Sequence, residues 1–307
     1  MASSRQRALS RLRTLIPLPV KCALLRVMRT ALGERAWLSY LFYKIRGRMP
    51  DLRNPRLLNE KILCKMLNDR RSILNMHSDK LRARDFVRER RPDLALPAIL
   101  WQSTIPASVP LADLPDRFVL KASHGSGWVK VVHDKRRENA AALSRLARRW
   151  LRKNYYFEFG GWAYKDAVPA VYAEEFLGAD VARAPDDYKL FVFNGRLKLI
   201  QIDRDRFGRH TQRLYDRDWR DVDGSMAAPR GAPVPRPLEL ERMIEAAEAL
   251  SDGIDIVRVD LYVIGDRVYF GEFTDYPNGG FGPIDPLELD EALGSQVTLD
   301  DYSKGRD

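Results

Sequence analysis

The chain is poor in the residues that mark several common classes of protein. It has only two cysteines, Cys22 and Cys64, and four histidines in 307 residues. Two cysteines without metal-type spacing exclude a disulfide framework and favour a reducing cytosol. No run approaches the roughly 20 apolar residues that a membrane-spanning helix needs. Pro17, Pro19 and Lys21 also interrupt any signal-type apolar segment, so we expect a cytoplasmic protein.

Most of the chain also lacks an excess of either charge. The formal net charge is +10, and residues 1–50 carry all of it, with eleven Lys or Arg against one acid, Glu34. The balanced remainder argues against a nucleic-acid groove. Apolar residues are spaced between the arginines of residues 1–50, a pattern typical of a peripheral contact with the anionic inner face of a membrane or with an acidic polymer. A helical arm packed on the body, with a solvated basic face, is the alternative.

The stretch from Ile256 to Gly282 is the most informative part of the sequence. Two β-prone runs, IVRVDLYVI and RVYFGEFT, flank Gly265-Asp266, which predicts a hairpin. Arg258 and Asp260 are two residues apart and share a face, and an antiparallel partner would bring Glu272 towards Asp260. Two carboxylates beside an arginine suit a divalent cation that bridges phosphate oxygens. A surface hairpin with salt-bridged charges is the alternative.

Two other stretches are suited to binding an anion. FVLKASHGSG predicts a strand over residues 118–122, followed by a loop whose glycines free N–H groups to cradle phosphate. Lys121 at the end of this strand needs an anion to neutralise it. The turn at 277–280 offers further N–H groups. The loop fits neither the P-loop nor the dinucleotide fingerprint, and an exposed hairpin loop is the alternative.

The remaining segments predict alternating helices and strands. We expect helices within 57–91, 138–154 and 237–251, and a strand at PAILW. Asn194-Gly195 predicts a second hairpin, in which Asp187 and Lys189 alternate with apolar residues. The charge-dense segment 203–223 is interpreted as a long loop over the site or a substrate surface, with a plain solvated insertion as the alternative.

Several short signatures, taken in order, resemble those of ATP-grasp ligases and, more narrowly, of the TupA-like (teichuronopeptide-biosynthesis type) branch. They are NPRLLNEKI, DKLRARDFV, LPDRFVLKASHGSG, AEEFL, DYKLFVFNGRLKLI, VRVDLY and YFGEFT. The resemblance implies an α+β ATP-grasp fold, in which two lobes with antiparallel sheets enclose ATP, plus a helical basic N-terminal extension. It divides the chain into an arm (1–50), a helical and linker region (51–115), a lid subdomain (116–177) and a catalytic subdomain (178–307).

The same resemblance implies an ATP site. Lys80 and Lys121 would contact the phosphates. The lid loop would be formed by Ser123, Gly125, Ser126 and Gly127, and the hinge that reads adenine by Glu174, Glu175, Phe176 and Leu177. Asp187 would face the ribose or the substrate. His124, in the same glycine-rich loop, is a further candidate for contact with a phosphate.

The resemblance also implies catalytic and metal-binding residues. Lys189 would face the transferred phosphate or the acceptor, and Arg258 would steady the charge of the reacting centre. Asp260 and Glu272 would hold Mg²⁺. Thr274 stands where many family members have an asparagine ligand, so the third ligand is left open between Thr274 and Asn278. Asp275 replaces an aromatic residue expected in this branch.

The implied activity is an ATP- and Mg²⁺-dependent carboxylate–amine ligation through an acyl phosphate. We expect the carboxylate acceptor to belong to a cell-surface polysaccharide or its lipid-linked precursor, and the amine donor to be an amino acid or similar unit. The basic arm and the arginines 204, 206, 209 and 213 motivate this choice. An ATP-dependent sugar phosphotransferase and a non-catalytic nucleotide- or polysaccharide-binding protein are the alternatives.

Overall fold

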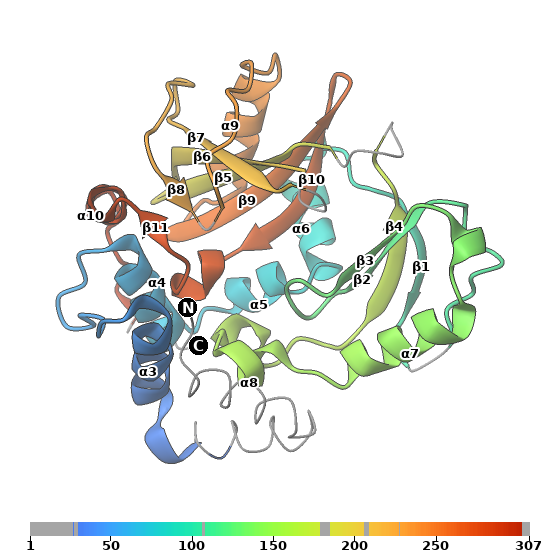
Figure 1. Ribbon diagram of the computed structural model, residues 1–307, viewed down its shortest axis with the longest axis horizontal. Helices are drawn as coiled ribbons and strands as arrows, with labels where there is room; N and C mark the ends of the chain where they lie inside the picture. Colours follow the sequence, from blue (N-terminus) through green and yellow to red (C-terminus); the bar gives the residue numbers. More distant parts are fainter. Residues whose placement is uncertain are drawn as a thin grey trace, which may run out of the picture.

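Two antiparallel sheets organise the chain (Figure 1). The computed structural model describes residue 27 and residues 30–105, 108–178, 185–205, 209–226 and 228–302. Within these residues helices cover the sheets, so the predicted α+β class with antiparallel sheets is confirmed. No helix in these ranges combines the length and the apolar character needed to cross a bilayer.

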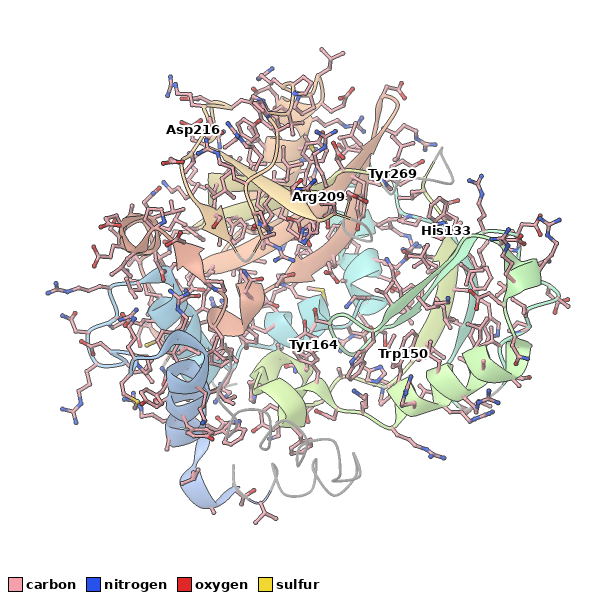
Figure 2. All side chains as sticks on the ribbon, viewed as in Figure 1. His133, Trp150, Tyr164, Arg209, Asp216 and Tyr269 are labelled. Atoms are coloured by element: carbon pink, nitrogen blue, oxygen red, sulfur yellow. The ribbon has the colours of Figure 1, made fainter. Side chains whose placement is uncertain are left out.

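The smaller sheet has four strands in the order β1-β4-β2-β3. Its strands are β1 (Ile99–Ser103), β4 (Val171–Glu175), β2 (Phe118–Ala122) and β3 (Val129–Val132). Helix α7 (Ala140–Leu151) covers one face, because Leu143, Ala147 and Trp150 recur on its buried side and pack against Phe118 and Leu120. Trp150 is labelled beneath this sheet in Figure 2. The sheet thus includes β1, a strand from the segment 51–115.

The larger sheet has five strands in the order β10-β9-β5-β6-β7. They are β10 (Arg267–Thr274), β9 (Ile256–Ile264), β5 (Asp187–Phe193), β6 (Arg196–Arg204) and β7 (Thr211–Tyr215). Both predicted hairpins are confirmed. Asn194 and Gly195 have φ of 48° and 74°, the left-handed conformation that a two-residue hairpin turn requires and that Asn and Gly tolerate.

The two faces of the larger sheet differ in character. One face is apolar throughout, because Leu190, Ile202 and Val259 alternate with the residues of the other face and pack against α9 (Leu240–Leu250). On the other face one half is apolar, with Phe191 and Leu199 packed among the helices at the N-terminal end of the described chain. The second half of that face is polar and forms the site described below.

Within the described residues, the helices from α3 to α6 precede the smaller sheet. They are α3 (Glu34–Arg46), α4 (Leu58–Asn68), α5 (Ser72–Ser78) and α6 (Arg82–Arg90). Helix α3 buries Trp37, Leu38 and Phe42 in the same core as α4, and Glu34 accepts a hydrogen bond from Arg70 at 3.1 Å. Residues 34–46 are therefore a packed helix, as in the alternative interpretation of the arm. Residues 1–26, 28 and 29 lie outside the described residues.

The expectation of one long loop over 203–223 was wrong. Strand β6 continues to Arg204, and residues 211–215 form β7, which pairs antiparallel with β6. The reason is an alternation hidden among the charges, since Gln212 and Leu214 are buried while Arg213 between them pairs with Asp221 at 2.5 Å.

The described chain is completed by short elements. These are η1 (Lys135–Arg137), α8 (Tyr155–Phe159), η2 (Trp162–Tyr164), β8 (Ser225–Met226), η3 (Pro277–Gly280), β11 (Ile284–Asp285) and α10 (Leu287–Ser295).

Helix α10 packs so closely on the start of α4 that only glycine fits at the contact. A Cβ at Gly294 would lie 2.0 Å from the carbonyl oxygen of Arg56 and 2.7 Å from the carbonyl carbon of Leu57. Because backbone cannot move aside as a side chain can, we expect Gly294→Ala to lower the free energy of unfolding by about 2–3 kcal/mol. Urea unfolding measures this, with the exposed Ser295→Ala as control, and equal stability of the two variants would contradict it.

Candidate active site

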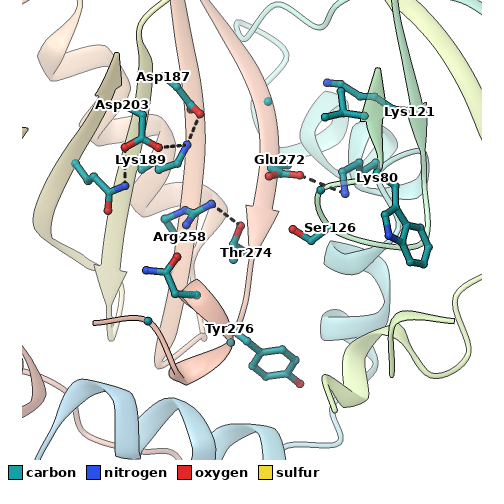
Figure 3. Close-up of a pocket in the computed structure, with 18 of the residues that line it drawn as sticks. Lys80, Lys121, Ser126, Asp187, Lys189, Asp203, Arg258, Glu272, Thr274 and Tyr276 are labelled. Atoms are coloured by element: carbon teal, nitrogen blue, oxygen red, sulfur yellow. Dashed lines mark hydrogen bonds and ion pairs between the residues drawn. The ribbon is translucent and has the colours of Figure 1, made fainter. Parts of the chain in front are cut away.

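A cavity of about 740 Å³ lies between the two sheets, a size typical of a small-molecule site. The smaller sheet, which belongs largely to the segment expected to be the lid, contributes one wall and the polar half of the larger sheet the other, with Tyr164 of η2 among the lining residues (Figures 2 and 3). Most of the predicted site residues line it: Lys80, Lys121, Ser126, Gly127, Glu174, Glu175, Phe176, Leu177, Asp187, Lys189, Arg258, Glu272, Thr274 and Asn278. Residues far apart in the sequence are thus brought to one place.

The polar wall is organised as a row of directly opposed residues across four strands. Glu272 on β10 faces Asp260 on β9, Asp260 faces Lys189 on β5, and Lys189 faces Gln201 on β6. Opposed residues on one face of an antiparallel sheet are about 5 Å apart. The row therefore extends about 15 Å across the sheet, from the edge that faces the lid.

A second row lies beside the first on the same face of the sheet, two residues away along β9, β5 and β6. It consists of Tyr262 on β9, Asp187 on β5, Asp203 on β6 and Gln212 on β7. Together the rows place carboxylates, a lysine and two amides on one sheet face. The period of two in the strand sequences is what puts them there.

Arg258, Asp260 and Lys189 form a buried ionic group at the centre of the wall. The guanidinium of Arg258 donates to both carboxylate oxygens of Asp260, at 2.6 and 2.7 Å, and to Oγ1 of Thr274 at 3.0 Å. Nζ of Lys189 is ion-paired with Asp187 and lies 3.4 Å from Asp260 and 3.5 Å from Asp203 (Figure 3). The prediction that Arg258 and Asp260 share a face is confirmed.

Two lysines occupy the opposite wall. Nζ of Lys80 lies 3.2 Å from Oε2 of Glu272 and donates to the carbonyl of Gly125 at 2.6 Å. Lys80 thereby connects the lid loop to the larger sheet. Lys121 is ion-paired with Glu174. Both side chains reach the cavity (Figure 3).

The predicted hinge comprises the last two residues of β4 and the two residues after it. Glu174 lies on β4 opposite Val119, and Nη1 of Arg84 is 4.0 Å from its carboxylate. Phe176 is held by the guanidinium of Arg117, 5.6 Å from the ring centroid, and by the edge of His133. This part of the wall is therefore partly aromatic and partly charged.

Three residues of the glycine-rich loop do not reach the cavity lining. Ser123 is fully buried, with its N–H donating to Ala170 and its hydroxyl to Val168. Gly125 presents its carbonyl to Lys80. His124 is buried between the carbonyl of Trp150 and the N–H of Ala170, and burial lowers the pKa of its imidazole. The candidate phosphate contact of His124 is therefore wrong, because both ring nitrogens have structural partners.

Asp260 also does not line the cavity, since its carboxylate faces Arg258 and Lys189. Among the described residues no group of three His, Cys, Asp or Glu side chains could hold a metal ion. Mg²⁺ bound to a nucleotide is held by one or two carboxylates together with phosphates and water. Glu272 supplies one carboxylate in the cavity, so the residues present fit an ion held mainly by its nucleotide.

Burial and the neighbouring positive charges shift the pKa of Glu272 in opposite directions. Burial raises the pKa of its carboxyl, but the positive charges of Lys80, Arg258, Lys121 and Lys189 outweigh it and lower the pKa to about 2. Glu272 is therefore a carboxylate at every physiological pH. Its negative charge is thus present without a proton to displace, as a ligand of a cation requires.

Four polar residues of the cavity were missed by the sequence interpretation: Gln201, Asp203, His210 and Gln212. Gln201 and Asp203 alternate with apolar residues on β6, as Asp187 and Lys189 do on β5. The same period-two signal would have found them. Nε2 of His210 lies 3.5 Å from Oδ1 of Asp203.

Comparison with known proteins places the chain in a family. Solved structures similar to it include D-alanine–D-alanine ligase from Bacillus anthracis complexed with ATP (17% identity, TM-score 0.39, 66% of this chain and 56% of that one). Another is the enzyme of the same name from Helicobacter pylori (14%, 0.44, 73% and 62%), and a third is the ATP-grasp ligase PsnB complexed with minimal precursor (14%, 0.40, 75% and 62%).

The chain thus spans 56% to 62% of the length of these three structures. No curated protein matches it by sequence. The family described as TupA-like ATPgrasp matches residues 60–298, which is most of the chain. The chain therefore belongs to the TupA-like ATP-grasp family and has the ATP-grasp fold.

Proposed function

We propose that the protein is an ATP- and Mg²⁺-dependent carboxylate–amine ligase that works through an acyl phosphate. The observation that carries the proposal is that Lys80 and Lys121 line one wall of the cavity while Glu272, Lys189 and Arg258 line the other. Such a cavity has cations on both sides of a space that would hold a triphosphate. In phosphoryl transfer the protein contributes mainly by positioning the reactants and by neutralising the negative charge of the phosphates.

In this proposal the nucleotide lies along the lid wall. The adenine would contact Glu175, Phe176 and Leu177 at the end of β4 and just after it, and Lys80 and Lys121 would contact the phosphates. Ser126 and Gly127 line the same wall, and backbone N–H groups of such a loop are suited to hold phosphate oxygens. Glu272 would hold Mg²⁺, which when bound neutralises phosphate charge during transfer.

The reaction would take place in front of Arg258 and Lys189. An acceptor carboxylate attacks the γ-phosphorus, the bond to the bridging oxygen of ADP breaks, and an acyl phosphate forms. An amine then attacks the acyl carbon, phosphate leaves, and the amine loses a proton to give an amide. Lys189 and Arg258 stabilise the negative charge that two anions bring together, and Asp187 and Asp260 keep both cations in place.

We propose as substrate a carboxylate of an acidic cell-surface polysaccharide or of its lipid-linked precursor. The positive charge of residues 1–50 supports an anionic partner at the inner face of the membrane. Of the arginines that motivated this choice, Arg204 and Arg213 are ion-paired with Asp186 and Asp221. Arg206 lies outside the described residues, so the support rests mainly on the N-terminal segment.

The test is release of ADP by the full chain with ATP, Mg²⁺, a panel of uronic acids and the twenty common amino acids. We expect ADP release that requires both a carboxylate and an amine, and mass spectrometry should identify an amide. A phosphorylated sugar would instead identify a phosphotransferase. Absence of ATP binding by calorimetry would contradict any catalytic function.

A further inference from the structure

The end of the polar row farthest from Glu272 carries a buried amide that has no role in the proposed ligase reaction. Gln201 lies on β6 at the end of the polar row and is only 3% exposed, yet it lines the cavity. Its Nε2 donates to Oδ1 of Asp203 at 2.8 Å. Its Oε1 is buried and accepts no hydrogen bond within the part of the chain that the structure describes. An amide oxygen buried without a donor costs free energy, so this atom is suited to a ligand.

The orientation of this amide is fixed by its neighbour. Because Nε2 is committed to the carboxylate of Asp203, Oε1 is the end of the amide that has no hydrogen-bond partner among the described residues. A ligand group that binds beside Asp203 and Gln201 must therefore donate hydrogen bonds from N–H or O–H groups.

The position of Gln201 selects among such groups. It is the residue directly opposite Lys189, about 5 Å away along the row, on the side away from Glu272 and Lys80. The nucleotide and its phosphates belong to the lysine-lined side, so the group next to Gln201 is the one that approaches the acyl phosphate from the opposite direction.

We propose that Gln201 binds the attacking amine of the donor substrate, with its Oε1 accepting an N–H hydrogen bond that turns the nitrogen lone pair towards the acyl carbon. The inference rests on the proposed ligase function and adds the residue that positions its second substrate. Gln201 holds the nucleophile without taking part in bond exchange. The donor is an amine small enough to enter the buried end of the cavity.

Two substitutions of Gln201 separate this role from a structural one. Gln201→Met and Gln201→Glu both remove the hydrogen bond to Asp203, but only glutamate keeps an acceptor oxygen at the same place. We expect Gln201→Met to raise the KM of the amine about 10- to 100-fold, as for loss of one buried hydrogen bond. The KM of ATP should change less than twofold. Gln201→Glu should stay closer to the wild type than Gln201→Met.

The kinetic assay uses the full chain with ATP, Mg²⁺ and D-glucuronate, and as amines hydroxylamine and the twenty common amino acids. Gln296→Met, on the exposed C-terminal end of α10, is the matched control and should behave as the wild type. If Gln201→Glu is as impaired as Gln201→Met, the contact with Asp203 is what matters and the proposal is wrong. A raised KM for glucuronate with an unchanged KM for the amine would assign Gln201 to the acceptor and also overturn it.

A binding measurement keeps the inference separate from the ligase function. Saturation-transfer NMR with the same amines and ADP should show contact with the wild type that is lost in Gln201→Met. If no amine binds the wild type, the subsite proposal fails even where ATP is hydrolysed. If amines bind but none supports ADP release, the ligase function fails while the subsite stands.

Discussion

Glu272→Gln is expected to reduce ADP formation about 10³-fold while the protein stays folded. Glu272 is the acid of the polar row that lines the cavity, and its replacement removes the carboxylate proposed to hold Mg²⁺ and the partner of Lys80. Initial rates at saturating ATP measure the effect. The exposed Asp113→Asn on the lid side serves as a control for loss of a charge. Retention of more than a tenth of the wild-type rate would contradict the metal assignment.

The same variant has a second readout in acid. The pKa of Glu272 is lowered from 4.5 to about 2 in the fold, so its charge stabilises the native state above the unfolded pKa. This contribution is lost as the pH falls from about 4.5 towards 2. It amounts to about 3 kcal/mol at neutral pH. We expect the difference in unfolding free energy between wild type and Glu272→Gln to shrink over that pH range, and a constant difference would contradict the assignment.

Asp260→Asn is expected to lower both activity and stability. Asp260 is 2% exposed and receives two hydrogen bonds from Arg258, so its neutralisation leaves buried positive charge uncompensated. Breaking such a pair costs about 3 kcal/mol or more. We expect ADP formation to fall about 10³-fold because Arg258 and Lys189 lose the group that orients them.

The loss of activity and the loss of stability are measured separately. Urea unfolding gives the loss of stability, and ADP release is measured at a temperature where circular dichroism shows the variant folded. An inactive but fully stable variant would mean that Asp260 is free to bind metal and is not the anchor of Arg258. A destabilised but fully active variant would remove Asp260 from the mechanism.

Local patterns predicted the strands and their turns. The alternation in β5, β9 and β10 is a property of consecutive residues, and Asn194-Gly195 specifies its turn through backbone conformations that few residues tolerate. The same alternation at the end of β6 and in β7 was masked by arginines and aspartates, such as Arg213 and Asp221, that pair with each other. Charge alone therefore misled the interpretation of 203–223 as a loop.

The side-chain partners within the site were not predictable in this way. Asp260 was expected in contact with Mg²⁺, and in the structure Arg258, two residues before it on the same strand, takes both its oxygens. His124 sits beside two glycines in the sequence, yet the burial of α7 against the lid turns its ring towards Trp150. Such choices depend on which groups are nearest in space.

The sequence by itself determined the two hairpins, β5–β6 and β9–β10, and which of their residues share a face, because the pleat of a strand repeats every two residues wherever the strand lies. Only the tertiary structure decided that Lys80 and Lys121 oppose Glu272 and that Gln201 ends the row begun by that acid. Strand order and register bring distant residues to within a few ångströms, and they are set by packing of the whole sheet against its helices.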